Sequence, residues 1–195
     1  MFENVDIKLA ASVVASILVI IGFAPYIKDI LQKNTQPHLY TWLIVIITQA
    51  TALVALINGG GGVFGSTVLI IGTSLMALIL ILSLKYGTKN ITKSDTIILF
   101  FALLAIIFWW QLDNPSLAVL TVSFIEALSY VPTFRKSYTE PYSETASFWL
   151  IMAIAAILVI ISLTEYNLLT VTYVLVQTVG NTSLYIMLLW RRKYM

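Results

Sequence analysis

Long apolar segments separated by short polar breaks run through the whole 195-residue chain. Several reach about 20 residues without a charged side chain, the length that spans a hydrocarbon core of about 30 Å. The pattern predicts an all-α integral membrane protein with seven transmembrane helices, at about residues 7–31, 38–57, 63–86, 94–112, 115–137, 144–163 and 168–190. The first is predicted to be a retained membrane helix, because its acidic start is unlike that of a signal peptide.

Proline, glycine and serine mark several predicted boundaries. Pro25 is expected to break or bend the first helix, because proline removes a hydrogen bond and clashes with the preceding turn. Four glycines at 59–62 are expected to end the second helix in a turn outside the membrane. They lack the lysine and Ser/Thr of a phosphate-binding P-loop. Ser94 is a predicted N-cap for the fourth helix, and Pro115 is suited to starting the fifth.

The composition agrees with a membrane protein. Hydrophobic residues make up 59% of the chain and charged residues only 10%, against about a quarter charged in soluble domains. The absence of cysteine excludes disulfides and thiolate catalysis, and a single histidine, His38, excludes a multi-histidine metal site. No nucleophile–base pair or cofactor motif can be assembled. We therefore expect no enzyme activity, no cofactor and no bound metal.

The basic residues predict how the chain crosses the membrane. Ten of the eleven fall in connections on one side, at positions 28, 33, 85, 89, 93, 135, 136, 191, 192 and 193, and only Lys8 falls on the other. The positive-inside rule then predicts an N-terminus outside and a C-terminus in the cytoplasm. Lys28, Arg135 and Lys136 are interpreted as serving topology and lipid headgroup contact, with a substrate carboxylate as a minor alternative partner.

One segment occurs twice, first at 22–29 and again at 129–136. Each copy has an aromatic residue two positions before a proline, a basic residue three after it and a tryptophan seventeen after it. Because Pro132 follows Pro25 by 107 positions, this offset maps the first three helices onto the last three. It predicts two parallel three-helix repeats, 1–88 and 114–195, joined by an inversion linker helix at 89–113.

The seven predicted spans form two three-helix units with one helix between them, and the first helix of each unit contains a proline. This arrangement resembles the SWEET and SemiSWEET sugar transporters of the PQ-loop superfamily. The family's Pro-Gln dipeptide is replaced here by Pro25-Tyr26 and Pro132-Thr133. In the SWEET proteins, paired asparagines on the third helix of each unit line the substrate cavity. Together, the resemblance and the 107-residue offset predict that Asn181 and Ser74 lie at the level of these cavity-lining asparagines.

Glu126 is the most informative single residue, because it lies well inside the fifth predicted helix. An ionisable group there costs several kcal/mol unless it is protonated, paired or facing water. Ser123 and Tyr130 share its helix face. Glu126 is interpreted either as a proton-coupling or substrate-binding carboxylate or as a polar pin that is hydrogen-bonded between helices.

Further polar side chains are predicted to line the same cavity. Four side chains recur at four-residue spacing along one stripe of the last helix, namely Tyr173, Gln177, Asn181 and Tyr185. Lipid cannot satisfy such groups, so they are expected to line a cavity or, alternatively, to bond to neighbouring helices. Gln49 in the second helix is expected to join them.

The paired tryptophans and prolines have two interpretations each. Trp42 and Trp149 are either interfacial anchors or a gate or stacking surface for a small solute. Pro25 and Pro132 are either static kinks or hinges that let one unit rock against the other.

These features predict a transporter that moves a small polar metabolite, such as a sugar, an amino acid or a vitamin-like solute, by alternating access, either passively or with proton coupling through Glu126. Its expected partners are that solute and the lipid bilayer, with no nucleic acid, and homo-oligomerisation is left open. The alternative is a non-transporting membrane receptor or structural protein, since PQ-loop relatives include the KDEL receptor, which carries no solute.

Overall fold

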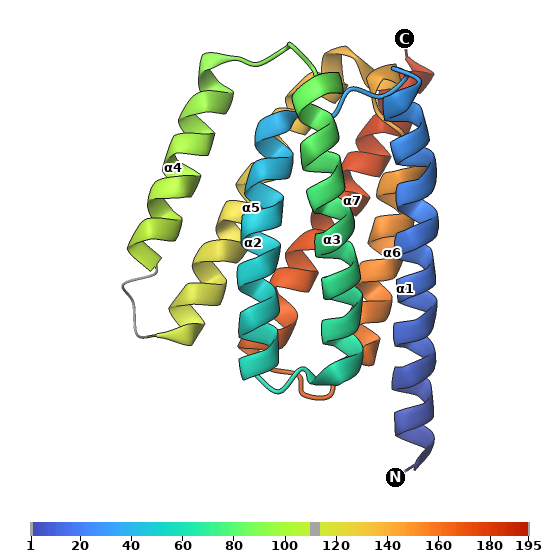
Figure 1. Ribbon diagram of the computed structural model, residues 1–195, viewed down its shortest axis with the longest axis vertical. Helices are drawn as coiled ribbons and strands as arrows, with labels where there is room; N and C mark the ends of the chain where they lie inside the picture. The colour runs from blue at the N-terminus through green and yellow to red at the C-terminus, as the bar shows by residue number, and fades with distance from the viewer. Residues whose placement is uncertain (1, 110–113, 195) are drawn as a thin grey trace.

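The computed structural model describes residues 2–109 and 114–194 (Figure 1). Its elements are α1 (Phe2–Leu31), α2 (Leu39–Asn58), α3 (Gly62–Tyr86), α4 (Lys93–Trp109), α5 (Pro115–Thr139), the short 3₁₀ helix η1 (Pro141–Ser143), α6 (Ala146–Ser162) and α7 (Leu168–Lys193). The described ranges contain no strand. The prediction of an all-α protein is confirmed for the described residues, which form seven α-helices, five of them long and apolar. Residues 110–113, the end of the predicted linker helix, lie outside the described part of the chain.

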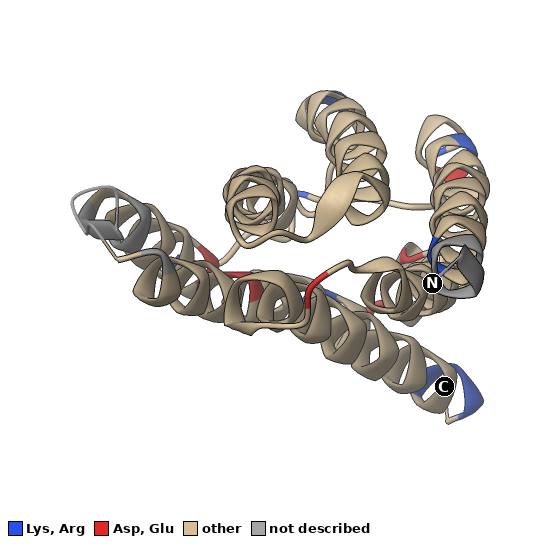
Figure 2. Ribbon diagram, turned by 90° about the horizontal axis from the view of Figure 1, so that it is seen from below, with Lys and Arg blue, Asp and Glu red and all other residues tan. Residues whose placement is uncertain are grey.

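The helices have the length and surface of membrane spans. Within the described residues, α1, α2, α3, α5 and α7 are each long and apolar enough to cross a membrane, and α6 is a shorter apolar helix. Their outward faces carry large hydrophobic side chains such as Ile81, Leu84 and Phe124. Seen from below, the ribbon is uncharged along most of its length (Figure 2). The molecule is therefore a membrane protein.

Local signals set several of these helix ends. The Asn114 side chain accepts hydrogen bonds from the first turn of α5, which begins with Pro115 as predicted. Asn167 forms a capping box with Thr170 at the start of α7. The glycine run ends α2 in a turn, as predicted, and Gly60 has a positive φ of 78° that suits glycine. The predicted cap at Ser94 is wrong, because α4 already begins at Lys93.

Six helices close a ring. Along it, α1 packs on α3, α3 on α2, α2 on α5, α5 on α7, α7 on α6 and α6 back on α1. Helix α4 lies outside this ring and packs mainly on α5 (Figure 1). The hydrophobic core therefore sits inside the ring. It contains residues from both halves of the chain, by which we mean α1–α3 and α5–α7.

Both internal prolines lie within continuous helices. Helix α1 runs through Pro25 and α5 runs through Pro132, so the expected break at Pro25 is not present. Phe23 and Tyr26, on either side of Pro25, are fully buried. Packing of these rings holds the helical path where the proline removes a hydrogen bond.

The connections sort to two ends of the molecule. Segments 32–38, 87–92 and 140–145 lie at the same end as the C-terminus (Figure 1), and we call this the basic end. The N-terminus and the α2–α3 and α6–α7 connections lie at the opposite end.

Candidate functional site

A cavity lies inside the six-helix ring, lined by side chains from α1, α2, α3, α5, α6 and α7. Its volume is about 60 Å³, which is enough to hold more than one water molecule. The cavity therefore lies where the two halves of the chain meet.

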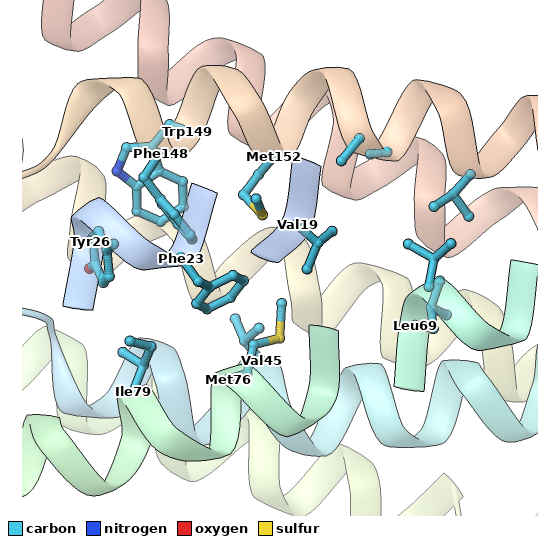
Figure 3. Close-up of a cluster of buried hydrophobic side chains, with 14 of the residues drawn as sticks. Val19, Phe23, Tyr26, Val45, Leu69, Met76, Ile79, Phe148, Trp149 and Met152 are labelled. Carbon is cyan, nitrogen blue, oxygen red and sulfur yellow. The ribbon is translucent and has the colours of Figure 1, made fainter. Parts of the chain in front are cut away.

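The lining divides into two walls. All of its carboxyl, amide and hydroxyl groups come from α2, α5 and α7, which we call the polar wall: Thr41, Gln49, Glu126, Tyr130, Gln177 and Asn181. Helices α1, α3 and α6 supply an apolar wall. Its side chains Val19, Phe23, Met76 and Met152 point toward one another in Figure 3. A solute in the cavity would thus meet hydrogen-bonding groups on one side only.

Glu126 lies on the polar wall with 0% of its surface exposed. Its Oε2 accepts a hydrogen bond from the Thr48 hydroxyl of α2. Its Oε1 has no hydrogen-bond partner, and neither has the nearby buried hydroxyl of Ser123. No lysine or arginine among the described residues pairs with this carboxyl group. Glu126 therefore keeps one oxygen free beside the cavity.

Amide and hydroxyl groups link the helices of the polar wall. Gln177 Nε2 donates to Gln49 Oε1 at 2.8 Å and lies 3.4 Å from the Tyr173 hydroxyl. Gln49 Nε2 in turn donates to Thr73 Oγ1 of α3 at 3.1 Å. The Tyr173 hydroxyl lies 3.5 Å from Thr48 Oγ1, which contacts Glu126. The predicted grouping of Gln49, Gln177 and Glu126 is present in the structure.

Tyr173 does not line the cavity as predicted. It is buried behind Gln177 and packs against Ala52, Val119 and Val122. A four-residue step turns about 40° past a full helical turn, so two steps from Asn181 carry Tyr173 off the cavity face. Its hydroxyl contacts Gln177 and Thr48, which belong to the hydrogen-bonded groups beside the cavity.

Asn181 does line the cavity, and its Oδ1 accepts a 3.0 Å hydrogen bond from the Tyr130 hydroxyl of α5. Gly180 is close enough that an added Cβ would lie 2.6 Å from the Tyr130 ring. The glycine thus lets α7 approach α5 and brings the two polar groups into contact. Sequence reasoning placed Tyr130 on the face of Glu126 but did not predict this bond.

Ser74, which was predicted to share the cavity with Asn181, does not line it. Its side chain is exposed on α3 and donates to the Ile70 carbonyl oxygen of the same helix at 3.0 Å.

The reason is a change of register between α3 and α7. Buried positions of α3 recur in α7 at a spacing of 105, since Met76 corresponds to Asn181 and Ile79 to Leu184. The offset of 107 is thus two residues too long here. Two residues turn a helix by about 200°, which moves Ser74 to the opposite face.

Trp42 and Trp149 are buried and line the cavity. The Tyr26 ring lies between them, with centroid distances of 5.6 Å to Trp42 and 6.5 Å to Trp149. Phe148 packs against the same rings, 4.4 Å from Tyr26. An interfacial anchor would face lipid, so the structure favours the interpretation as an aromatic surface toward the cavity.

A buried ion pair lies between this aromatic cluster and the basic end. Lys136 Nζ contacts Glu144 Oε1 and donates to the Gln36 carbonyl oxygen at 2.7 Å. Oε2 of Glu144 accepts 3.3 Å hydrogen bonds from Tyr26 and from the Trp149 indole. Lys136 is 0% exposed, so its predicted role in headgroup contact is wrong. Counting charges by loop gives no signal for burial, which is why sequence reasoning missed this pair.

Further contacts close the basic end between the two halves of the chain. The hydroxyls of Thr35 and Thr145 are 2.6 Å apart, and Thr145 also donates to Asp29 at 2.7 Å. At the opposite end, Asn167 Nδ2 donates to the Gly59 carbonyl oxygen at 2.9 Å. Both ends of the cavity thus carry contacts between the halves.

A second charged cluster holds α4 at the basic end. Asp95 accepts hydrogen bonds from the Arg135 guanidinium at 2.7 and 3.2 Å. His38 Nε2 lies 3.4 Å from the Asp95 carboxylate without the alignment of a hydrogen bond. Burial lowers the pKa of His38, against the opposing pull of Asp95. His38 is therefore neutral near pH 7.

Comparisons of the chain with protein-family models, with curated proteins and with solved structures found no match. Among the described residues, no three His, Cys, Asp or Glu side chains gather to hold a metal ion. The geometry of the cavity is therefore the basis for a functional proposal.

Proposed function

We propose that the chain is a membrane transporter that moves a small solute by alternating access between two three-helix repeats, 1–88 and 114–195. The observation that carries the proposal is Glu126, a buried carboxyl group with a free oxygen, on a cavity between the two halves. Intramembrane ionisable groups mark substrate or proton pathways by default, because their burial is expensive. Most buried polar atoms of folded proteins are hydrogen-bonded, so the free oxygen supports a functional role of Glu126 over a purely structural pin.

The burial pattern supports a repeat. Phe23 and Tyr130, and likewise Trp42 and Trp149, are buried at the 107-residue offset, and α3 and α7 match at 105. The ring order supports it too. Exchanging α1, α2 and α3 for α5, α6 and α7 turns the ring onto itself, as a twofold axis through the cavity would. Helix α4 outside the ring then has the position of a linker. This is the arrangement that the resemblance to SWEET-like PQ-loop proteins implies.

The orientation proposed is an outer N-terminus and a cytoplasmic basic end, because ten of the eleven basic residues lie toward that end. In this conformation the basic end is held by the Thr35–Thr145 contact and by hydrogen bonds from Lys136 to the Gln36 carbonyl oxygen and from Tyr26 to Glu144. Opening toward the cytoplasm must break the contacts between halves. Pro25 and Pro132 are proposed as the hinges, since each lies in its helix just before this closed region.

The direct test is solute counterflow into liposomes that contain the purified protein, with a panel of sugars, amino acids, vitamins and amines. Accumulation of one class supports transport. Binding of a panel member without any movement across the bilayer would instead identify a receptor. Replacing both Pro25 and Pro132 by alanine should slow turnover without loss of the folded protein, and unchanged uptake would contradict the hinge assignment.

A cross-link tests alternating access. The chain has no cysteine, so in a Thr35→Cys/Thr145→Cys variant the new pair supplies the only thiols. Because the two hydroxyls are in contact, oxidation should join the cysteines and stop uptake, and a reductant should restore it. Each single variant serves as a control. Full uptake by the cross-linked protein would show that the basic end need not open.

A further inference from the structure

We propose that the solute is a small organic monocation that competes with a proton for Glu126 and exchanges with it across the membrane. The inference rests on the proposed transport function and names the substrate class of the same cavity.

Glu126 is the only charged side chain among the residues that line the cavity. No lysine, arginine or histidine of the described chain lies on it, so a substrate carboxylate or phosphate would have no counter-ion. The free Oε1 of Glu126 is fully buried. A buried carboxylate is costly unless a positive charge or a proton neutralises it. The site thus matches a positively charged ligand.

The two walls restrict the ligand further. Rings of Phe23, Trp42, Phe148 and Trp149 line the cavity, and aromatic faces attract alkylammonium groups by cation–π interaction. The apolar wall offers no hydrogen-bonding partner for a sugar, whose hydroxyls point in all directions. Leaving such hydroxyls unpaired would cost binding energy. An ammonium ion with methyl or methylene groups presents its charge to Glu126 and its carbon atoms to the apolar wall.

Glu126 is the one acidic or basic residue among those that line the cavity. Helices α2, α4 and α7 pack against α5. The titratable groups that face Glu126 are the hydroxyls of Tyr173 on α7 and Tyr130 on α5, while α2 contributes the uncharged Thr48 and Gln49. The Asp95 carboxylate of α4 lies at the basic end, paired with Arg135. The carboxyl group therefore carries either one proton or one bound cation.

Because Glu126 carries either a proton or a cation, the movement of one is coupled to the movement of the other. When the cation binds, the Glu126 proton leaves, and when the cation leaves, a proton returns. The loaded cavity is neutral in both states, so one monovalent cation crosses in one direction for one proton in the other. Transport should respond to a pH gradient and not to the membrane potential.

The test uses tetramethylammonium, which cannot lose a proton and cross the bilayer as a free base. Liposomes containing the whole protein are given a pH gradient, and separately a potassium-diffusion potential with valinomycin. We expect labelled tetramethylammonium to accumulate on the acidic side and to ignore the potential. Its apparent Kd in detergent should rise about tenfold for each pH unit of acidification while Glu126 is protonated.

Glu126→Gln should abolish both the gradient-driven uptake and the pH dependence of binding. Glu165→Gln is the matched control, since Glu165 is exposed at the opposite end, and it should behave like the parent. Thermal unfolding of both variants verifies that they are folded. Uptake of a neutral sugar without tetramethylammonium uptake would overturn this inference and leave the transporter proposal standing. The absence of uptake of any solute would overturn both.

Discussion

Glu126 and Glu144 are both buried carboxyl groups, with 0% and 2% of their surfaces exposed, yet their surroundings differ. Glu144 contacts Lys136 and accepts hydrogen bonds from Tyr26 and Trp149. Glu126 has one hydrogen bond from Thr48 and a second oxygen with none. Glu144 is thus satisfied by its own protein, and Glu126 is incomplete without a proton or a ligand.

The difference shows how a closing contact is distinguished from a binding site. Burial alone marks both residues, since a charge away from water is expensive in either place. The number of partners separates them, because unsatisfied buried groups are rare in folded proteins and call for an explanation. Variants that alter the partners of each group therefore test the distinction.

The largest effect is expected for Lys136→Met. It leaves Glu144 buried without its counter-ion, and breaking a buried pair from one side costs about 3–5 kcal/mol. Thermal unfolding in detergent should show a large drop in stability. The double variant Lys136→Met/Glu144→Gln should recover most of the loss. If the single variant were as stable as the parent, Glu144 would not depend on the pair.

An intermediate effect is expected for Asn181→Ala, which removes the one hydrogen-bond partner that the buried Tyr130 hydroxyl has among the described residues. An unpaired buried polar group costs about 1–3 kcal/mol. The variant Ser74→Ala is the control and should change stability by less than about 0.5 kcal/mol. Equal effects of the two substitutions would contradict the placement of Ser74 outside the cavity.

Glu126→Gln should change the free energy of unfolding by less than about 1 kcal/mol, because no counter-ion is left unpaired. The comparison with Lys136→Met is the informative one. Stability should depend strongly on the Glu144 site and weakly on Glu126, while uptake should depend on both. A destabilisation by Glu126→Gln as large as that by Lys136→Met would instead make Glu126 a structural pin.

The smallest effect is expected for His38. Burial of its side chain lowers its pKa from the ordinary value of 6.5. As the pH falls through this value, the unfolded chain binds more protons than the folded protein. The contribution of His38 to stability is therefore fully present above this pH and declines as the pH falls. Unfolding temperatures measured from about pH 7.5 to about pH 5.5 should decrease. His38→Asn should show a shallower decrease, and an identical slope would assign the effect to other groups.

The helices were the most predictable part of the structure, because apolar segments of membrane length leave few alternatives. Glu126 could also be singled out from the sequence, because an ionisable side chain inside a membrane-length apolar segment is costly and is therefore a candidate functional residue. Ser74 was misplaced because the offset of 107 was carried to α3 and α7, whose buried positions match at an offset of 105. The Lys136–Glu144 pair could not be predicted, because its members lie eight positions apart in sequence and meet through tertiary packing.

Helix α6 has a consequence for the surrounding lipid. Its 17 residues extend about 26 Å at 1.5 Å per residue, less than a typical hydrocarbon core of about 30 Å. Ile154, Ile157 and Ile161 lie on its exposed face, which in a bilayer would meet the acyl chains. The bilayer must thin locally beside α6 or the helix must draw polar groups inward. Hydrophobic mismatch would then make the protein sensitive to membrane thickness, with lipids of shorter acyl chains fitting it best.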